Sequence, residues 1–498
     1  MSTYNYYRSV FVSALVLGAL LLGGAVVQAA DPPIPWNIET LLQRIPPLKH
    51  DPTGRLPMVT WEAFVTKDAP QAFNRAEPLP AEMYRELAKR GLAQCIRMNE
   101  RYIPVALAMQ QAGVKVIVME GGGGDVQKTY RKDGQHQFPK DYQPKGDIHG
   151  CPLLLDAWNT MAQELRGRLQ KFRDAGVTID AAWMDWEHEP WWMEDEWQQS
   201  RHCLRCQQIF PPGVLDDHDR YRAYIIRLRQ QLYSTYLAAP ILEYYPKCSI
   251  TNWTQLHSSP EYPNQSFGGG TRFPPMDIGL FTASNPVAYG VDTIYKYHWS
   301  QVWGAAAKDV LLDAAHMDRV YTWVMLTQTS RDAAVSAAWA PEKRSIPWVA
   351  RYCPDEEDAK VPIMSRDRYR EVLRHLFLRG AQTLQIFNAN RPKTPNIETE
   401  EVEDAVAVYD EMLEYRPFLE HGAIMCCDVP AAASDAPIWS GLRLDNTALI
   451  RAYTQGPKTV PVTITPWKDG PTVTLNAPQQ GATYLLTRQG EKIAVVKR

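Results

Sequence analysis

The chain has 498 residues, of which 45% are apolar and 22% are charged, and its formal net charge is −3. These proportions are typical of a globular protein and exclude a disordered chain, a coiled coil and a protein with many membrane spans. A net charge so close to zero gives no basic surface for nucleic acid. The 16 tryptophans and 24 tyrosines indicate either a large aromatic core or rings that stack on the apolar faces of a ligand.

The first thirty residues are typical of an export signal. Residues 10–27 are apolar and uncharged, Arg8 precedes them, and Val27 and Ala29 occupy the −3 and −1 positions of a cleavage site. We therefore expect residues 1–29 to be a signal peptide and the protein to be secreted or periplasmic. The same run is long enough to serve as an uncleaved membrane anchor, which is the alternative. We expect no other contact with a membrane, because no second long apolar run follows.

Strand patterns alternate with helix patterns through most of the chain. Short apolar runs predict strands at 58–64, 92–98, 114–119, 179–184, 249–253, 277–282, 320–326 and 381–387. Amphipathic stretches predict helices at 81–90, 100–112, 153–175, 218–238, 299–318, 365–378 and 400–416. This alternation predicts an α/β fold with a parallel sheet, and eight strand–helix units favour a (β/α)8 TIM barrel over an open sheet.

The helical pattern ends near residue 421. Residues 437–498 consist of short alternating runs such as 447–453, which are separated by glycine and proline turns. This pattern predicts a small C-terminal antiparallel β-sandwich. We therefore expect a signal peptide over 1–29, a barrel over 30–420 and the β-sandwich domain over 421–498.

Acidic residues concentrate after the fourth predicted strand. Trp183, Asp185, Glu187 and Glu189 share one side of the chain as long as the strand stays extended. The C-terminal ends of barrel strands line the active site, and two carboxylates about 6–7 Å apart repel each other, which raises the pKa of one of them. A protonated carboxyl beside an ionised one is what a general acid for glycosidic cleavage needs. A solvated acidic loop is the alternative, but tryptophans surround these carboxylates at positions 183, 186, 191, 192 and 197.

The run Asp180-x-x-x-x-Asp185-Trp186-Glu187 resembles the DxxDxDxE signature of family 18 glycoside hydrolases, the chitinases and endo-N-acetylglucosaminidases. It also resembles the DWE segment of the hyaluronidases. The resemblance implies a TIM-barrel glycosidase in which Glu187 is the general acid/base. It further implies that Asp185 orients the N-acetyl group of the substrate, which supplies the nucleophile. The sequence departs from the signature at Trp183, where family 18 has a further aspartate.

Enzymes with Asn-Glu-Pro after strand four are a rival resemblance, because Glu189-Pro190 could mimic that motif. Those enzymes need a nucleophilic glutamate after strand seven. Residues 320–330, which include the predicted seventh strand, contain no glutamate. This absence counts against the rival.

Other predicted strand ends carry residues suited to binding sugars. Amide side chains both donate and accept hydrogen bonds, and aromatic rings stack on sugar faces. Each amide could equally cap a loop. Together with Glu189 and Trp183, the candidates for substrate binding are Trp61, Glu120, Asn252, Trp253, Trp323 and Asn388.

Eight cysteines are compatible with disulfides but are few for a disulfide scaffold. Cys203 and Cys206 form a CxxC pair, and Cys151 follows His149 by two positions. These residues are compatible with a disulfide, with free thiols, or with zinc bound by three cysteines and one histidine. No HxH or HExxH pattern is present. We expect no cofactor and no metal in the catalytic site.

Three functions fit the sequence. The first is a secreted glycoside hydrolase that acts on an oligo- or polysaccharide through Asp185 and Glu187. The second is a carbohydrate-binding barrel without catalysis, which Trp183 in place of an aspartate supports. The third is a hydrolase supported by zinc at Cys151, Cys203 and Cys206.

The signal-peptide hypothesis predicts that the exported protein begins at Ala30. Amino-terminal sequencing of the protein recovered after expression in a secreting host measures this directly. An intact Met1 in a membrane fraction would show that the apolar run is a retained anchor.

Overall fold

In the computed structural model of the protein, the structure describes residues 37–60, 77–120, 137–143, 151, 153–184, 194–253, 286–289, 319, 322–323, 325–326, 346–351, 364–386, 397–426, 429–430 and 434–498. All of them belong to one compact unit, Ile34–Arg498, and Met1–Pro33 form a separate unit. The predicted signal peptide over 1–29 lies outside the described residues. Of the helices within these ranges, none is both long enough and apolar enough to cross a membrane.

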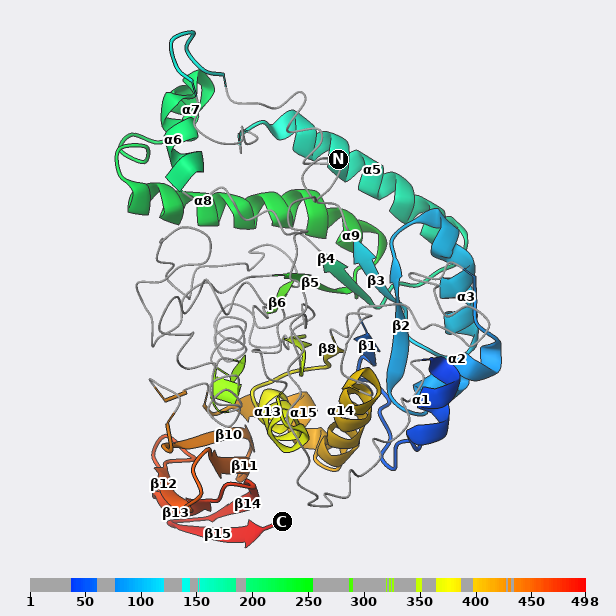
Figure 1. Ribbon diagram of the computed structural model, residues 1–498, viewed down its shortest axis with the longest axis vertical. Coiled ribbons are helices and arrows are strands. Elements are labelled where there is room, and N and C mark those ends of the chain that lie inside the picture. Colours follow the sequence, from blue (N-terminus) through cyan, green and yellow to red (C-terminus); the bar gives the residue numbers. More distant parts are fainter. Residues whose placement is uncertain are drawn as a thin grey trace, which may run out of the picture. The chain divides into compact units, whose positions relative to one another are not determined.

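An eight-stranded sheet forms the centre of the α/β part, in the order β6-β5-β4-β3-β2-β1-β8-β7 (Figure 1). Every neighbouring pair in this sheet is parallel. Its strands are β1 (Met58–Thr60), β2 (Leu92–Arg97), β3 (Ile117–Glu120), β4 (Ala181–Met184), β5 (Ser249–Trp253), β6 (Pro286–Tyr289), β7 (Trp348–Val349) and β8 (Gln385–Ile386). The predicted parallel sheet is confirmed.

The parallel sheet is curled. Val59 of β1 and Gln385 of β8 line the same small apolar cavity as Ile117 of β3 and Ala181 of β4. Strands that are separated in the sheet order therefore face one interior, as in a barrel. A pairing of the outer strands β6 and β7, which would close a barrel, is not among the pairings of the described residues.

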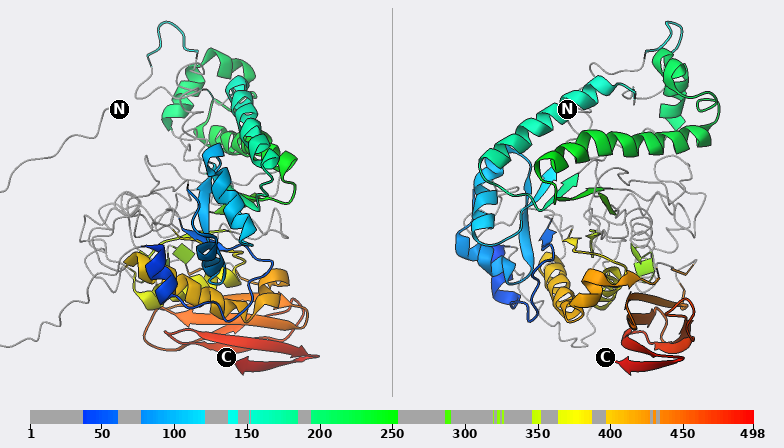
Figure 2. Two further views of the ribbon diagram at one scale, coloured as in Figure 1. Left: turned by 90° about the vertical axis from the view of Figure 1, so that its right-hand side faces the viewer. Right: turned by 180° about the vertical axis from the view of Figure 1, so that it is seen from behind.

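Within the described residues, helices connect the successive strands from β1 to β5 and connect β7 to β8, and they lie outside the sheet (Figure 2). Every predicted helix that falls within the described residues is present, and the predicted helix 299–318 lies outside them. The helices before β5 are α1 (Ile38–Arg44), α2 (Ala81–Ala88), the 3₁₀ helix η1 (Glu100–Tyr102), α3 (Ile103–Gln111), α5 (Leu155–Asp174), α6 (Glu194–His202), α7 (Leu204–Ile209), α8 (His218–Tyr233), the π-helix η3 (Ser234–Ala238) and α9 (Ala239–Tyr244). Those after β7 are α13 (Arg366–Leu378), α14 (Ile397–Leu413) and α15 (Arg416–His421).

The strand predicted at 320–326 is wrong. Residues 322–323 and 325–326 are helical and buried. A short apolar run fits a buried helix as well as a strand, and the buried positions here are three residues apart, which is a helical spacing. The seventh strand is instead β7 at Trp348–Val349, which is too short to give a period. The strand predicted at 277–282 lies outside the described residues, and β6 follows it at Pro286–Tyr289.

Antiparallel sheets follow residue 422, as the sequence predicts. Five strands pair in the order β15-β14-β11-β10-β9, and β12 pairs with β13. The hairpin formed by β12 and β13 contacts β10 and β11. A second hydrophobic core lies within this part of the chain and includes Ile450, Val462, Trp467, Leu475 and Leu486. The strands are β9 (Ala423–Ile424), β10 (Pro437–Leu444), β11 (Thr447–Thr454), β12 (Val460–Ile464), β13 (Val473–Ala477), β14 (Ala482–Gln489) and β15 (Lys492–Lys497).

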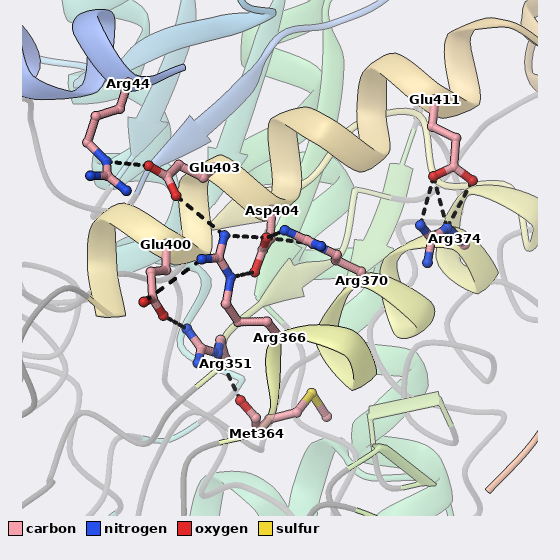
Figure 3. A network of polar contacts seen from close by, with 10 residues as sticks. All are labelled: Arg44, Arg351, Met364, Arg366, Arg370, Arg374, Glu400, Glu403, Asp404 and Glu411. Atoms are coloured by element: carbon pink, nitrogen blue, oxygen red, sulfur yellow. Dashed lines mark hydrogen bonds and ion pairs between the residues drawn. The ribbon is translucent and has the colours of Figure 1, made fainter. Parts of the chain in front are cut away.

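Helix α13 is joined to α14 by ion pairs (Figure 3). Arg366, Arg370 and Arg374 are spaced by four residues and so share one face of α13. Asp404 of α14 is completely buried and accepts hydrogen bonds from Arg366 Nε at 2.8 Å and from Arg370 Nε at 2.6 Å. Arg374 Nη2 lies 2.8 Å from Glu411 Oε2, about two turns beyond Asp404 on α14. Because a buried carboxylate needs partners, this spacing fixes how the two helices pack.

Another face of α13 contacts the antiparallel sheet, and α13 lies between this sheet and the parallel strands in both Figure 1 and Figure 2. Glu371 accepts hydrogen bonds from Arg451 of β11, with Nε at 2.8 Å and Nη2 at 2.6 Å. His375 Nε2 lies 3.3 Å from Glu371 Oε1, and its Nδ1 lies 2.7 Å from Ser440 Oγ of β10. Gly481 approaches the Glu371–Arg451 pair at a φ of +70°, so a side chain there would collide with both groups.

This buried network shifts two pKa values. Burial by itself raises the pKa of Glu371, but hydrogen bonds and charge from His375 and Arg451 outweigh it and lower the pKa to about 2. Burial lowers the pKa of His375 to about 4, against the opposing effect of Glu371. Both groups therefore resist protonation in the folded protein.

We predict that Arg451→Met lowers the free energy of unfolding by about 3–5 kcal/mol, because it leaves Glu371 buried without its cation. Thermal and urea unfolding of the purified variant measure the loss. Arg488→Met is the matched control, since Arg488 lies on neighbouring β14, is half-buried and donates its Nε to Gly490 O. An Arg451 variant as stable as this control would show that the ion pair does not hold α13 to the sheet.

We also predict that His375 makes the protein less stable in mild acid. Its folded pKa of about 4 lies below its ordinary value of 6.5, so only the unfolded chain gains a proton between these values. Stability falls as the pH falls through this range, by at most about 3 kcal/mol. The stabilisation that Glu371 supplies to the folded protein is lost at lower pH, as the pH falls toward its folded pKa of about 2. Melting temperatures measured from pH 7 to pH 4 should fall less steeply for His375→Gln than for the unmutated protein, and equal slopes would contradict the assignment.

Candidate functional site

The exits of β3, β4 and β5 form one row at the C-terminal edge of the parallel sheet. Glu120 of β3 pairs with Met184 of β4, Met184 pairs with Asn252 of β5, and Asn252 pairs with Ala288 of β6. Neighbouring strands are about 4.8 Å apart, so the backbones of Glu120 and Asn252 lie about 10 Å apart with β4 between them. Asp185 follows Met184 directly in the sequence. The register therefore sets Met184, which directly precedes the acidic segment in the sequence, between the backbone positions of a carboxyl and an amide residue.

The predicted site residues follow adjacent strands. Trp183 lies in β4, Glu120 is the last residue of β3, and Asn252 and Trp253 end β5. Asp185, Glu187, Glu189, Trp61 and Asn388 lie outside the described residues. By sequence, Trp61 comes directly after β1 and Asn388 two residues after β8, which pair with each other.

Asp180, the first acidic residue of the motif, lies at the opposite end of β4. Its Oδ2 accepts a hydrogen bond of 2.8 Å from the Val116 N–H, and its carbonyl accepts one of 2.9 Å from Ser249 N. Burial raises the pKa of Asp180, although the Val116 N–H and Lys115 oppose this. Asp180 comes four positions before Met184, which is about 13 Å along a strand. Asp180 thus joins β3 to β4 and β4 to β5 at the start of the strands.

Two of the tryptophans that the sequence analysis singled out, the buried Trp323 and the partly buried Trp197, make packing contacts. Trp323 is helical, has no exposed surface, and donates its Nε1–H to Pro430 O at 2.8 Å. Its predicted place at a strand end is therefore wrong. Trp197, one of the tryptophans near the acidic segment, lies in α6, donates its Nε1–H to Leu215 O at 3.0 Å and stacks on His218. These contacts account for the positions of both rings without a bound sugar.

Sequence reasoning missed two positions at strand exits. Tyr289 is the last residue of β6 and pairs with Trp253, so it belongs to the C-terminal edge. The run 286–289 has only four residues, which is a weak signal beside the longer apolar run at 277–282. Arg351 follows β7 closely, but its backbone N–H donates to Glu401 and its Nε donates to Met364 O at 2.8 Å. Arg351 therefore fixes the exit of β7 to the start of α14.

The corrected seventh strand changes one argument about mechanism. The rival enzymes with Asn-Glu-Pro after strand four were disfavoured because 320–330 contain no glutamate. Since β7 is at Trp348–Val349, the residues that follow strand seven include Glu356 and Glu357 in the sequence. The absence of a glutamate from 320–330 no longer counts against that rival.

Within the described ranges, one cluster of metal-ligating side chains is present, formed by Cys151, Cys203 and Cys206. The structure thus brings together the three cysteines that the sequence grouped. Neither the CxxC pair nor Cys151 forms a disulfide in this structure. They lie in the connections after β3 and β4.

No protein-family model matches the sequence, and no curated protein matches it either. Glycoside hydrolases are among the solved structures that the chain resembles. The family 36 α-galactosidase AgaA of Geobacillus stearothermophilus has a TM-score of 0.45 and 10% identity, with 92% of this chain and 57% of that chain covered. The α-galactosidase of Lactobacillus brevis has a TM-score of 0.45 and 12% identity, with 90% and 55% covered. Amy13B of Eubacterium rectale has a TM-score of 0.43 and 8% identity, with 91% and 99% covered. The chain thus spans little more than half the length of the two α-galactosidases.

Proposed function

We propose that the protein is a secreted glycoside hydrolase that cleaves oligo- or polysaccharides by general acid/base catalysis, with Glu187 as the acid/base and Asp185 as its partner. The observation that carries this proposal is the register of β3, β4 and β5. This register aligns Met184, which directly precedes Asp185 in the sequence, with Glu120 and Asn252 at the C-terminal edge, and so supports the proposal. In parallel α/β folds this edge is where substrates bind.

The two carboxylates have different proposed roles, which we assign from their order along the chain. Glu187 comes two residues after Asp185 in the sequence, so we assign it the role of protonating the leaving-group oxygen. In this mechanism the negative charge of Asp185 would raise the pKa of Glu187, so that Glu187 would hold a proton when substrate binds. On an N-acetylated sugar, Asp185 would orient the acetamido group that attacks the anomeric carbon, as the resemblance to family 18 implies.

The remaining parts of the proposal concern the surroundings of this pair. We include Glu189, Trp183, Trp61, Glu120, Asn252, Trp253 and Asn388 as substrate-binding residues, and we leave out the buried Trp323. The curled sheet is proposed to close into a (β/α)8 barrel within a domain over 30–420, followed by a β-sandwich domain over 421–498. Export through the signal peptide would place the enzyme outside the cytoplasm.

A carbohydrate-binding barrel without catalysis is the second candidate. The observation that favours it is Trp183, which stands where the family 18 signature has an aspartate. Such a protein would bind a glycan at the same edge and release it unchanged. Turnover therefore separates the two candidates.

We predict that Glu187→Gln lowers kcat on the natural substrate by about 10²–10⁴-fold, because it removes the proton donor and keeps the shape. A panel of aryl glycosides and polysaccharides identifies the substrate and measures the loss. Activated aryl glycosides should be partly spared, since their leaving groups need little protonation.

Asp185→Asn should move the alkaline limb of the pH profile to lower pH, because the loss of its charge lowers the pKa of Glu187.

Two control variants accompany this test. Glu243→Gln changes an exposed carboxylate that pairs with Arg166 on the helical surface and should keep full activity. Glu189→Gln should lose less activity than Glu187→Gln. If Glu189→Gln is inactive and Glu187→Gln is normal, the acid is Glu189, and Glu356 and Glu357 become the candidates for the nucleophile. Glycan binding without turnover by the unmutated protein would favour the binding-only function.

A further inference from the structure

Three buried sulfur atoms converge between two connections of the α/β fold. Cys151 lies shortly before α5, in the connection that follows β3, whereas Cys203 and Cys206 lie at the start of α7, in the connection that follows β4. The three Sγ atoms all lie within 4.8 Å of one another, and none of the three residues has exposed surface. Cys151 Sγ and Cys206 Sγ are 3.6 Å apart.

This spacing matches the sulfur positions around a tetrahedral zinc ion. A Zn–S bond of about 2.3 Å in tetrahedral geometry holds neighbouring sulfurs about 3.8 Å apart. A disulfide could join only two of the three cysteines and would leave the third thiol buried beside it. A metal ion uses all three sulfurs, and thiolates are the ligands that zinc prefers among soft donors.

The backbone around the sulfurs supports the same conclusion. Gln137 donates its N–H to Cys203 Sγ at 3.4 Å, and Leu204 returns a hydrogen bond of 2.8 Å from its own N–H to Gln137 O. Hydrogen bonds from backbone N–H groups to ligating sulfur orient the ligands of zinc sites. The adjacent His202 faces elsewhere, because its ring stacks on Tyr142 at 3.9 Å and its Nδ1 lies 2.8 Å from Gln198 O.

We propose that Cys151, Cys203 and Cys206 bind a structural Zn²⁺ ion. The described residues supply three of the four ligands that such an ion takes, and the thiol protons pass to solvent as it binds. The ion would join the connection after β3 to α6 and α7, which pack against each other and, through α6, against α8 (Figure 1). This role is independent of the proposed glycosidase activity.

Metal analysis of the full chain tests the proposal. Protein purified without added metal and dialysed against metal-free buffer should contain about one zinc per chain by mass spectrometry. Cys206→Ser should lose this zinc, whereas Cys248→Ser, which changes a buried cysteine at the start of β5, should keep it. Chelation should lower the melting temperature of the unmutated protein and should speed cleavage by trypsin between residues 121 and 154, and neither effect should occur in Cys206→Ser.

A second measurement does not depend on the folding of a variant. Unmutated protein stripped of metal and supplied with Co²⁺ should show sulfur-to-cobalt charge-transfer absorption and the visible bands of tetrahedral cobalt. Peptide mapping that finds a Cys151–Cys206 disulfide, or a metal-free protein that gains no such bands, would overturn the proposal. Iron in place of zinc would overturn the choice of metal, and zinc retained in Cys206→Ser would overturn the choice of ligands.

Discussion

The parallel, in-register pairing of β3, β4 and β5 is the constraint on which the candidate site depends. Parallel strands cannot be joined by tight turns, so the chain must cross over between them, and each new strand then ends at the same edge of the sheet. The crossovers here include α5 and the α8–α9 region. As a result Glu120, Met184 and Asn252, which are far apart in the sequence, form one row. A change of register by one residue on β4 would exchange the side chains that face the interior with those that face the helices.

Helix α13 supplies the second constraint, because it carries two sets of charged residues on different faces. The arginines at 366, 370 and 374 bind carboxylates of α14, whereas Glu371 and His375 bind Arg451 and Ser440 of the antiparallel sheet. The packing of α13 therefore couples the end of the parallel sheet at β7 and β8 to the C-terminal strands. Each of these buried charges is stable only with its partner in place, so the network specifies one arrangement of the helix.

The elements with a hydrophobic pattern over many residues were predicted from the sequence, whereas those that depend on distant contacts were missed. The strand 249–253 was predicted with its observed bounds, and it lies between a segment that contains Pro246 and a polar segment. The run 320–326 was misassigned, since its β-branched and aromatic residues suit a strand while its burial follows a helical spacing. Strand β7 has two residues and gives no pattern at all. The partners of Glu371 and Asp404 lie 80 and 38 residues away, and only the folded chain shows that they meet. The acidic segment after β4 is a candidate site on the sequence alone, because carboxylates two residues apart among tryptophans give a local signal.

The central claim is that the segment after β4 holds the scissile bond at the shared edge of β3, β4 and β5. A crystal structure of the Glu187→Gln protein, soaked with the oligosaccharide that the unmutated enzyme cleaves, tests it most directly. The account predicts a sugar at this edge, with the glycosidic oxygen at about 2.6–3.2 Å from the amide of residue 187 and with contacts to Glu120 or Asn252. A sugar bound to the antiparallel sheets, or one whose glycosidic oxygen faces other carboxylates, would contradict it.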